Sequence, residues 1–286
     1  MNEDGLWQAI ALLSDVMEGL SDDILDQDWT WRDHLEGVRF ALIGTFHELK
    51  DLAVYLGRSR QAAGNPVSSA QHVLGQYHGA YRDLQAVLLG VRDAELDIPP
   101  SPEDWSLRRV LGHIIGADLT FFVLVHYAVN WQRDGLTPRK VMPDEADSLV
   151  GTSDAFEQTM DSQGLTGIFA YYDPFHHRIL EDLAPWDEED LQAPSLFWEK
   201  DPLPVQYRLH RFDAHLRQHT VQVEKTMEGI GKRTNEARRL LRLVYAALAE
   251  VESLLIGAQE LGLTRRQDVV TTIRLRAEQI QQLVAT

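Results

Sequence analysis

The sequence of 286 residues contains no cysteine. Disulfide bonds, thiolate metal sites and a cysteine nucleophile are therefore excluded, and histidine and carboxylate side chains remain as the ligands for any metal. A chain without disulfides is compatible with a reducing compartment, so we expect a cytoplasmic protein.

Basic residues and long apolar runs are also scarce. Lysine and arginine total 27 against 44 aspartates and glutamates, a formal charge of −17 that would repel a nucleic-acid backbone. The longest apolar run, LTFFVLVHYAV at 119–129, is shorter than the ~20 residues that span a bilayer and is interpreted as buried helix. The N-terminal stretch MNEDGLWQAIALLSD lacks the basic region of a secretory signal. We therefore expect neither nucleic acid nor a membrane as partner.

Strict alternation of apolar and polar residues is hard to find, whereas apolar residues recur every three or four positions. This periodicity predicts an all-α protein, and 44% apolar residues are enough to build a hydrophobic core. The helix that includes 211–227 should end at Gly229 and Gly231, and 133–165 should be a long loop with room for one short helix. The other expected helices cover about 6–20, 31–60, 69–94, 105–131 (N-cap Ser101 or Ser106), 166–183, 235–261 and 264–284.

Two histidines stand one helical turn apart in RFDAHLRQHTVQVEKTM, residues 211–227. His215 and His219 share one face of the helix and can converge on one ion. The spacing alone is weak evidence, since 11 histidines in this chain give about 0.4 such pairs by chance. Leu216 stands where the H-E-x-x-H motif has its glutamate, which excludes that metalloprotease motif.

A third ligand must come from another helix, and His113 in WSLRRVLGHIIGAD is the best candidate. The small residues Gly112, Gly116 and Ala117 would let a neighbouring helix approach closely. The alternative is a core histidine bonded to a carbonyl, because four apolar residues indicate that this part of the helix is buried: Val110, Leu111, Ile114 and Ile115.

WSLRRVLGHIIGAD, followed later by HRFDAHLRQHTVQVEKTM, resembles the DinB/YfiT-like family of four-helix-bundle metalloproteins over residues 78–231. The resemblance implies a four-helix bundle of the up-down-down-up type, with His113, His215 and His219 as ligands of a divalent metal. Zinc or nickel is expected most, and iron or manganese are possible. Some members of that family use a low-molecular-weight thiol as cosubstrate.

The resemblance also implies three parts of the chain. Residues 1–77 would be an N-terminal helical extension and 78–231 the bundle with the metal site. Residues 232–286 would form a C-terminal helical hairpin, packed on the bundle or at an interface.

Three neutral imidazoles leave at least one coordination position open, as in catalytic sites. The bound metal would lower the pKa of a coordinated water or thiol. Because the chain has no thiol, a sulfur nucleophile would arrive with the cosubstrate. We expect a metal-dependent enzyme acting on a small molecule by hydrolysis or thiol-linked transfer, with no general acid or base evident in the sequence.

Candidates for hydrogen bonds to the ligand histidines are Gln222, Asp118 and Glu224. The adjacent His176 and His177 point about 100° apart on a helix and cannot line one site together. The favoured interpretation makes both of them surface or rim residues, and the alternative turns one of them into the bundle beside Tyr172. Trp186 and Trp198 are expected to be lids over the core, or else walls of a pocket.

Two further hypotheses belong to other classes of protein. The same fold could capture a ligand without catalysis. Alternatively, the histidines could be incidental and the chain a helical interaction module whose flanking hairpins form a homodimer. The last hypothesis predicts no stoichiometric metal.

Overall fold

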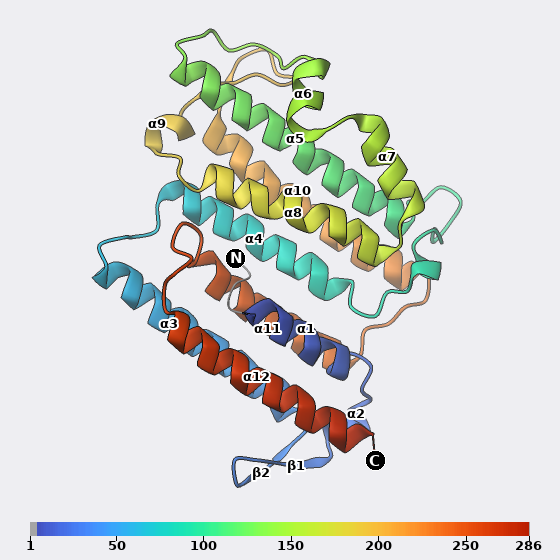
Figure 1. Cartoon of the computed structure of the whole chain (residues 1–286). Helices are drawn as coiled ribbons and strands as arrows, with labels where there is room; N and C mark the ends of the chain where they lie inside the picture. Colours follow the sequence, from blue (N-terminus) through green and yellow to red (C-terminus); the bar gives the residue numbers. More distant parts are fainter. Residues whose placement is uncertain (1–4, 286) are drawn as a thin grey trace. The chain divides into compact units, whose positions relative to one another are not determined.

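The computed structural model describes residues 5–285, which fold into two compact, mainly helical units (Figure 1). The flanking unit contains the chain up to Val67, Tyr81–Gly90 and the chain from Arg233 onward. The central unit contains Ser68–Ala80 and Val91–Lys232. Helix α4 (Ser69–Val87) contributes to both. The prediction of an all-α protein is confirmed for the described residues, whose only strands form two very small sheets.

The flanking unit is built around four long helices. Its elements are α1 (Leu6–Met17), α2 (Asp22–Leu25), β1 (Asp28–Trp31), β2 (His34–Gly37), α3 (Phe40–Ala62), α11 (Glu236–Ser253) and α12 (Leu263–Val284). Helix α11 packs chiefly against α3, and α12 packs chiefly against α1. The N-terminal and C-terminal segments, predicted as separate parts, thus share one unit. Each amphipathic helix buries its apolar stripe against a helix from the other end of the chain.

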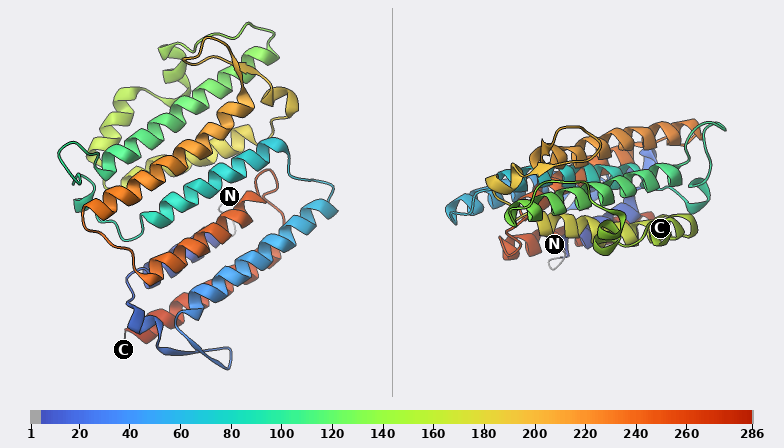
Figure 2. Two further views of the ribbon diagram at one scale, coloured as in Figure 1. Left: turned by 180° about the vertical axis from the view of Figure 1, so that it is seen from behind. Right: turned by 90° about the horizontal axis from the view of Figure 1, so that it is seen from above.

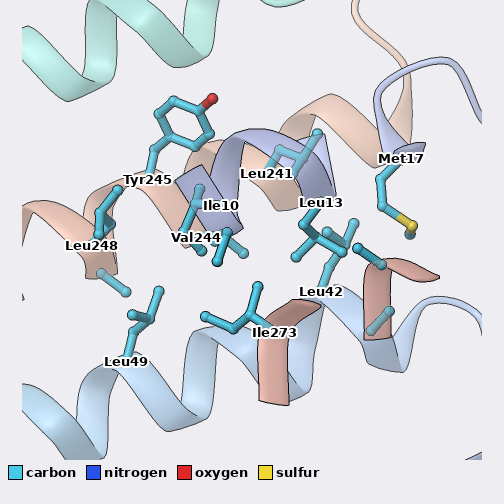
Figure 3. Close-up of a cluster of buried hydrophobic side chains, with 14 of the residues drawn as sticks. Ile10, Leu13, Met17, Leu42, Leu49, Leu241, Val244, Tyr245, Leu248 and Ile273 are labelled. Atoms are coloured by element: carbon cyan, nitrogen blue, oxygen red, sulfur yellow. The ribbon is translucent and has the colours of Figure 1, made fainter. Parts of the chain in front are cut away.

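Aliphatic side chains fill the middle of this unit (Figure 3). Ile10, Leu13, Leu42, Leu248 and Ile273 are all fully buried and come from α1, α3, α11 and α12. At about 25 cal/mol for each Å² of apolar surface removed from water, such burial is the main source of the unit's stability.

A β-hairpin occupies the start of the predicted helix 31–60, which begins only at Phe40. Arg32 and Asp33 have positive φ angles of 48° and 69°, the conformation of a tight two-residue turn between antiparallel strands. Trp29 and Trp31 are both buried, with exposed residues between and after them, so period-two alternation was present over a very short stretch. The prediction of helix before Phe40 was wrong, because an alternation over only four residues is a weak signal.

The central unit contains the first part of α4 and the long helices α5 (Leu107–Arg133), α8 (Leu165–Leu183) and α10 (Val205–Gly229). Helices α5 and α10 lie side by side over much of their length (Figure 2). The shorter elements are η1 (Asp93–Glu95), α6 (Pro143–Val150), α7 (Ser153–Ser162), α9 (Glu188–Leu191) and the antiparallel pair β3 (Pro194–Ser195) and β4 (Leu203–Pro204).

Helix α5 begins after Ser106, whose hydroxyl accepts a hydrogen bond from the backbone N–H of Arg109 at 3.4 Å. Of the two N-cap candidates, Ser106 is therefore the correct one. Among the described residues, α5 is the one helix long and apolar enough to cross a membrane. However, 56% of its most apolar 18-residue stretch is buried inside the protein. The core helix of a folded unit has the same properties, as predicted for 119–129.

The region 133–165 is not one long loop, since it forms two helices, α6 and α7. Local caps explain both: the Glu145 carboxylate accepts from the N–H of Met142, and the Thr152 hydroxyl accepts from the N–H of Ala155. Helix α7 lies against α5, where a Cβ on Gly116 would be only 3.5 Å from the Phe156 ring. A side-chain Cβ would fit at this distance, so the packing of α7 on α5 does not depend on the glycines.

Candidate metal centre

The three histidines chosen from the sequence meet in the central unit. His113 lies on α5, while His215 and His219 lie one turn apart on α10. One ring nitrogen of each falls within 4.8 Å of the other two. The Nε2 atoms of His113 and His215 are 3.1 Å apart, and the ring centroids of His215 and His219 are separated by 4.3 Å. The side-by-side packing of α5 and α10 therefore creates a cluster that could hold a metal ion.

The nitrogen spacing fits the donor set of a zinc-like ion. Two imidazole nitrogens bound at 2.0–2.1 Å in tetrahedral geometry would stand about 3.3 Å apart. The 3.1 Å between His113 Nε2 and His215 Nε2 is close to this value. Three neutral imidazoles suit a divalent transition metal and leave a position for an external ligand.

Gln222 orients one of the three rings. Its Oε1 lies 2.7 Å from Nδ1 of His219 and can accept a hydrogen bond from the N–H at that position, which leaves the Nε2 lone pair of His219 for an ion. This contact confirms Gln222 among the predicted partners. Asp118 is not such a partner, because it accepts hydrogen bonds from two tyrosines elsewhere in the bundle.

The cluster is buried on one side and open on the other. His215 and His219 are each only 8% exposed, whereas His113 is exposed to solvent. The apolar neighbours of His113 face the bundle, so the expectation of burial holds for this part of α5 but not for the ring itself. An external molecule can reach the cluster from the His113 side.

Burial keeps two of the three imidazoles neutral. Burial first, and then the neighbouring His219, His113 and Arg211, together lower the pKa of His215 from 6.5 to about 3. Burial also lowers the pKa of His113, with a smaller contribution from His219. At neutral pH these two imidazoles are therefore unprotonated, the form that ligates metals.

Two aromatic rings pack edge-on against histidines of the cluster. The Trp105 ring meets His113 edge-on at 5.3 Å, and the Phe121 ring meets His215 edge-on at 5.6 Å. The guanidinium of Arg109 stacks over Trp105 at 4.5 Å. These rings restrict the imidazoles and reduce contact with water, which strengthens any interaction with a charged ligand.

A sequence profile of the DinB superfamily matches residues 76–223, just over half of the chain. The chain belongs to the DinB superfamily. The match contains all three histidines and nearly coincides with the 78–231 expected from the sequence. No curated protein and no solved structure matches the chain.

A second polar cluster lies in the middle of this DinB bundle. The carboxylate of Asp118 on α5 accepts hydrogen bonds from the hydroxyl groups of Tyr77 on α4, at 2.5 Å, and Tyr172 on α8. His78 on α4 and His176 on α8 face each other, with 2.9 Å between Nδ1 of His78 and Nε2 of His176. All five side chains are almost completely buried.

This interior cluster corrects the interpretation of two histidines. His176 is not a surface residue: it faces the bundle beside Tyr172, as the alternative had it, whereas His177 is only half-buried. The pairing of His176 with His78 was not predicted. Partners 98 residues apart in the sequence leave no local signal.

Burial raises the pKa of Asp118 from 3.8 to about 7, although the two tyrosine hydroxyl groups oppose the shift by bonding to the charged form. Burial also raises the pKa of Tyr77 well above its usual value, with the nearby Asp118 adding to the rise. The centre of the bundle thus disfavours negative charge.

Proposed function

We propose that this DinB-superfamily chain binds one divalent metal ion through His113, His215 and His219 and uses it on a small-molecule substrate. The convergence of the three ring nitrogens within 4.8 Å carries the proposal. The absence of a fourth protein ligand in this set leaves room for substrate, as in catalytic three-histidine sites.

The ion, once bound, supplies a Lewis acid that polarises a coordinated oxygen or acidifies a coordinated thiol. The protein holds the imidazoles of His215 and His113 neutral through burial, fixes the ring of His219 through Gln222, and leaves the side of His113 accessible. Hydrolysis and thiol-linked transfer are the two reaction types that this arrangement supports. Zinc and nickel are the preferred ions, followed by iron and manganese.

Metal content measured by mass spectrometry on untagged protein tests the proposal. His219→Ala is the test variant, and His210→Ala, an exposed histidine on the same helix, is its matched control. We expect about one ion per chain in the wild type and in His210→Ala, and almost none in His219→Ala. Wild-type protein that holds no stoichiometric metal after dialysis against zinc, nickel and iron(II) would refute the proposal.

A chelator provides a second readout. If the ion binds only the folded chain, removing it lowers the midpoint of thermal unfolding, and excess zinc restores it. His219→Ala should show neither effect. Equal thermal midpoints for the wild type with and without chelator would contradict a bound ion.

A further inference from the structure

The central unit contains a cavity of about 530 Å³ beside α5 that opens to solvent. Three sides surround it: one face of α5, helix α6 with the start of α7, and the segment 196–198 between β3 and β4. Its volume falls within the usual range of small-molecule sites, about 300–1,000 Å³. None of the three clustered histidines lines it.

The lining is predominantly apolar. Leu119, Val123 and Leu124 on α5 form a buried base, and Phe156 and Phe197 contribute half-buried rings. Such a lining favours contact with the apolar part of a ligand.

Few polar groups in the cavity are available to a ligand. The Thr120 hydroxyl donates to the carbonyl of Gly116 at 2.8 Å, and the Thr152 hydroxyl caps α7. Lys140 and Asp147 are exposed residues of opposite charge and favour no net charge on an occupant. Recognition must therefore come mostly from apolar contacts.

The wall at 196–198 is held in place. Buried Arg208 on α10 binds both ends of this segment: its Nε donates to the Ser195 hydroxyl at 3.0 Å, and its Nη1 donates to the Glu199 carboxylate at 2.6 Å. Side chains of the segment can thus project into the cavity without collapse of the loop.

Helix α6, which forms the opposite wall, is also held by side-chain hydrogen bonds. The Tyr127 hydroxyl donates to the carbonyl of Glu145 at 3.0 Å, and Arg178 on α8 donates to the carbonyl of Leu149 at 2.9 Å. Helix α6 is therefore attached to both α5 and α8. The cavity exists before any ligand arrives, which lowers the entropic cost of binding.

The cavity and the three-histidine cluster both use residues of α5. Gly116 and Thr120, which line the cavity, follow His113 by three and seven residues and so share its helix face. At 1.5 Å per residue they lie about 4.5 Å and about 10.5 Å farther along the axis. A molecule in the cavity can therefore extend one end to the cluster.

We propose that this cavity binds the apolar body, aliphatic or aromatic, of a small-molecule ligand whose other end reaches the three histidines. The substrate class inferred here rests on the proposed function, whereas binding in the cavity does not require a metal. Trp198, which lines the cavity and remains 64% exposed, becomes partly covered by the ligand. The alternative interpretation of Trp198 as a pocket wall is therefore the correct one, while Trp186 is buried as a lid.

Titration with N-phenyl-1-naphthylamine, an uncharged fluorophore, tests the cavity. Thr120→Trp places an indole in it, and Thr271→Trp on α12 is the matched control, because Thr271 is also an exposed helical threonine bonded to the carbonyl four residues earlier. We expect one saturable site per chain in the wild type and the control, with affinity at least about tenfold weaker in Thr120→Trp. Trp198→Ala, at an exposed position, should weaken binding severalfold without loss of helical circular dichroism.

Wild-type protein stripped of metal by a chelator separates this inference from the proposed function. It should bind the fluorophore like the untreated wild type, because binding in the cavity requires no metal. No saturable binding in the wild type, or equal binding in Thr120→Trp and Thr271→Trp, overturns the cavity proposal even if metal is present. Fluorophore binding to a chain that never takes up metal refutes the proposed function and its substrate class, and leaves a ligand-binding cavity.

Discussion

The flanking and central units are both built around long amphipathic helices, yet they bury different kinds of polar side chain. In the flanking unit the buried charges are mainly arginines with fixed partners: Arg82 pairs with Glu252, and Arg276 pairs with Glu48. In the central unit the buried groups include four histidines and Asp118, and burial raises the pKa of Asp118 to about 7. The flanking unit's two histidines, His34 and His47, are both exposed.

Because of this difference, we expect the polar groups of the flanking unit to serve stability and those of the central unit to serve binding and proton transfer. A guanidinium stays charged at any physiological pH, so a paired arginine contributes to one fixed arrangement. Imidazole and a buried carboxyl group can lose or gain a proton or, for imidazole, bind an ion. Substitutions in the flanking unit should therefore alter stability without altering the site, and substitutions in the central unit should alter pH dependence and binding.

The largest expected effect concerns the buried ion pair of the flanking unit. Glu252→Gln leaves the guanidinium of Arg82 buried without its countercharge, which should lower the free energy of unfolding by about 3–5 kcal/mol. Glu250→Gln on the same helix, which removes the partner of the largely exposed Lys50, should cost no more than about 1 kcal/mol. Urea unfolding measures both, and metal content should be unchanged in each variant. Similar losses in the free energy of unfolding for the two variants would contradict a stabilising role for the buried Arg82–Glu252 pair.

The next effect is the pH dependence that Asp118 confers on the central unit. Its pKa in the folded state, about 7, lies above the ordinary 3.8, so folded protein keeps a proton that unfolded protein releases. Stability should consequently fall as pH rises from about 4 to about 7, by on the order of 4 kcal/mol, and then level off. Asp118→Asn cannot ionise and should lack this decline.

Urea midpoints at low protein concentration, from about pH 4 to about pH 8, measure this difference in slope. Asp182→Asn, which removes a carboxylate that is 43% exposed, is the control and should follow the wild type. The slope is compared, because loss of the tyrosine hydrogen bonds can shift the absolute stability of Asp118→Asn. A decline in Asp118→Asn as steep as that of the wild type would show that burial of this carboxyl group does not carry the effect.

The smallest effect concerns Gln222. Gln222→Ala removes the acceptor for Nδ1 of His219, so the ring can rotate and change tautomer. We expect about 10-fold to 100-fold weaker zinc binding in a competition titration with a chelating indicator. Gln218→Ala, an exposed glutamine one turn earlier on α10, should bind like the wild type. Equal affinities for the two variants would mean that the Gln222 contact does not orient the ligand.

Local patterns carried enough information for most of the long helices, and the family resemblance supplied the three histidines. The spacing of His215 and His219 follows from helix geometry alone, and the cap at Ser106 is a local signal. The hairpin at 28–37 and helices α6 and α7 were missed because their signals are short. The interior cluster could not be predicted, since Asp118 meets Tyr77 and Tyr172 from 41 and 54 residues away.

The sequence by itself therefore determined the all-α class, the family and the residues able to bind a metal, because these depend on periodicity and residue type. Only the tertiary structure decided that the two ends of the chain share one unit, that His113 is the exposed member of the histidine cluster, and that His176 turns inward to His78. It also produced the cavity beside α5, whose walls come from segments up to about 80 residues apart. These features depend on which helix faces meet, and helix–helix contacts between distant segments are set by packing of the whole unit.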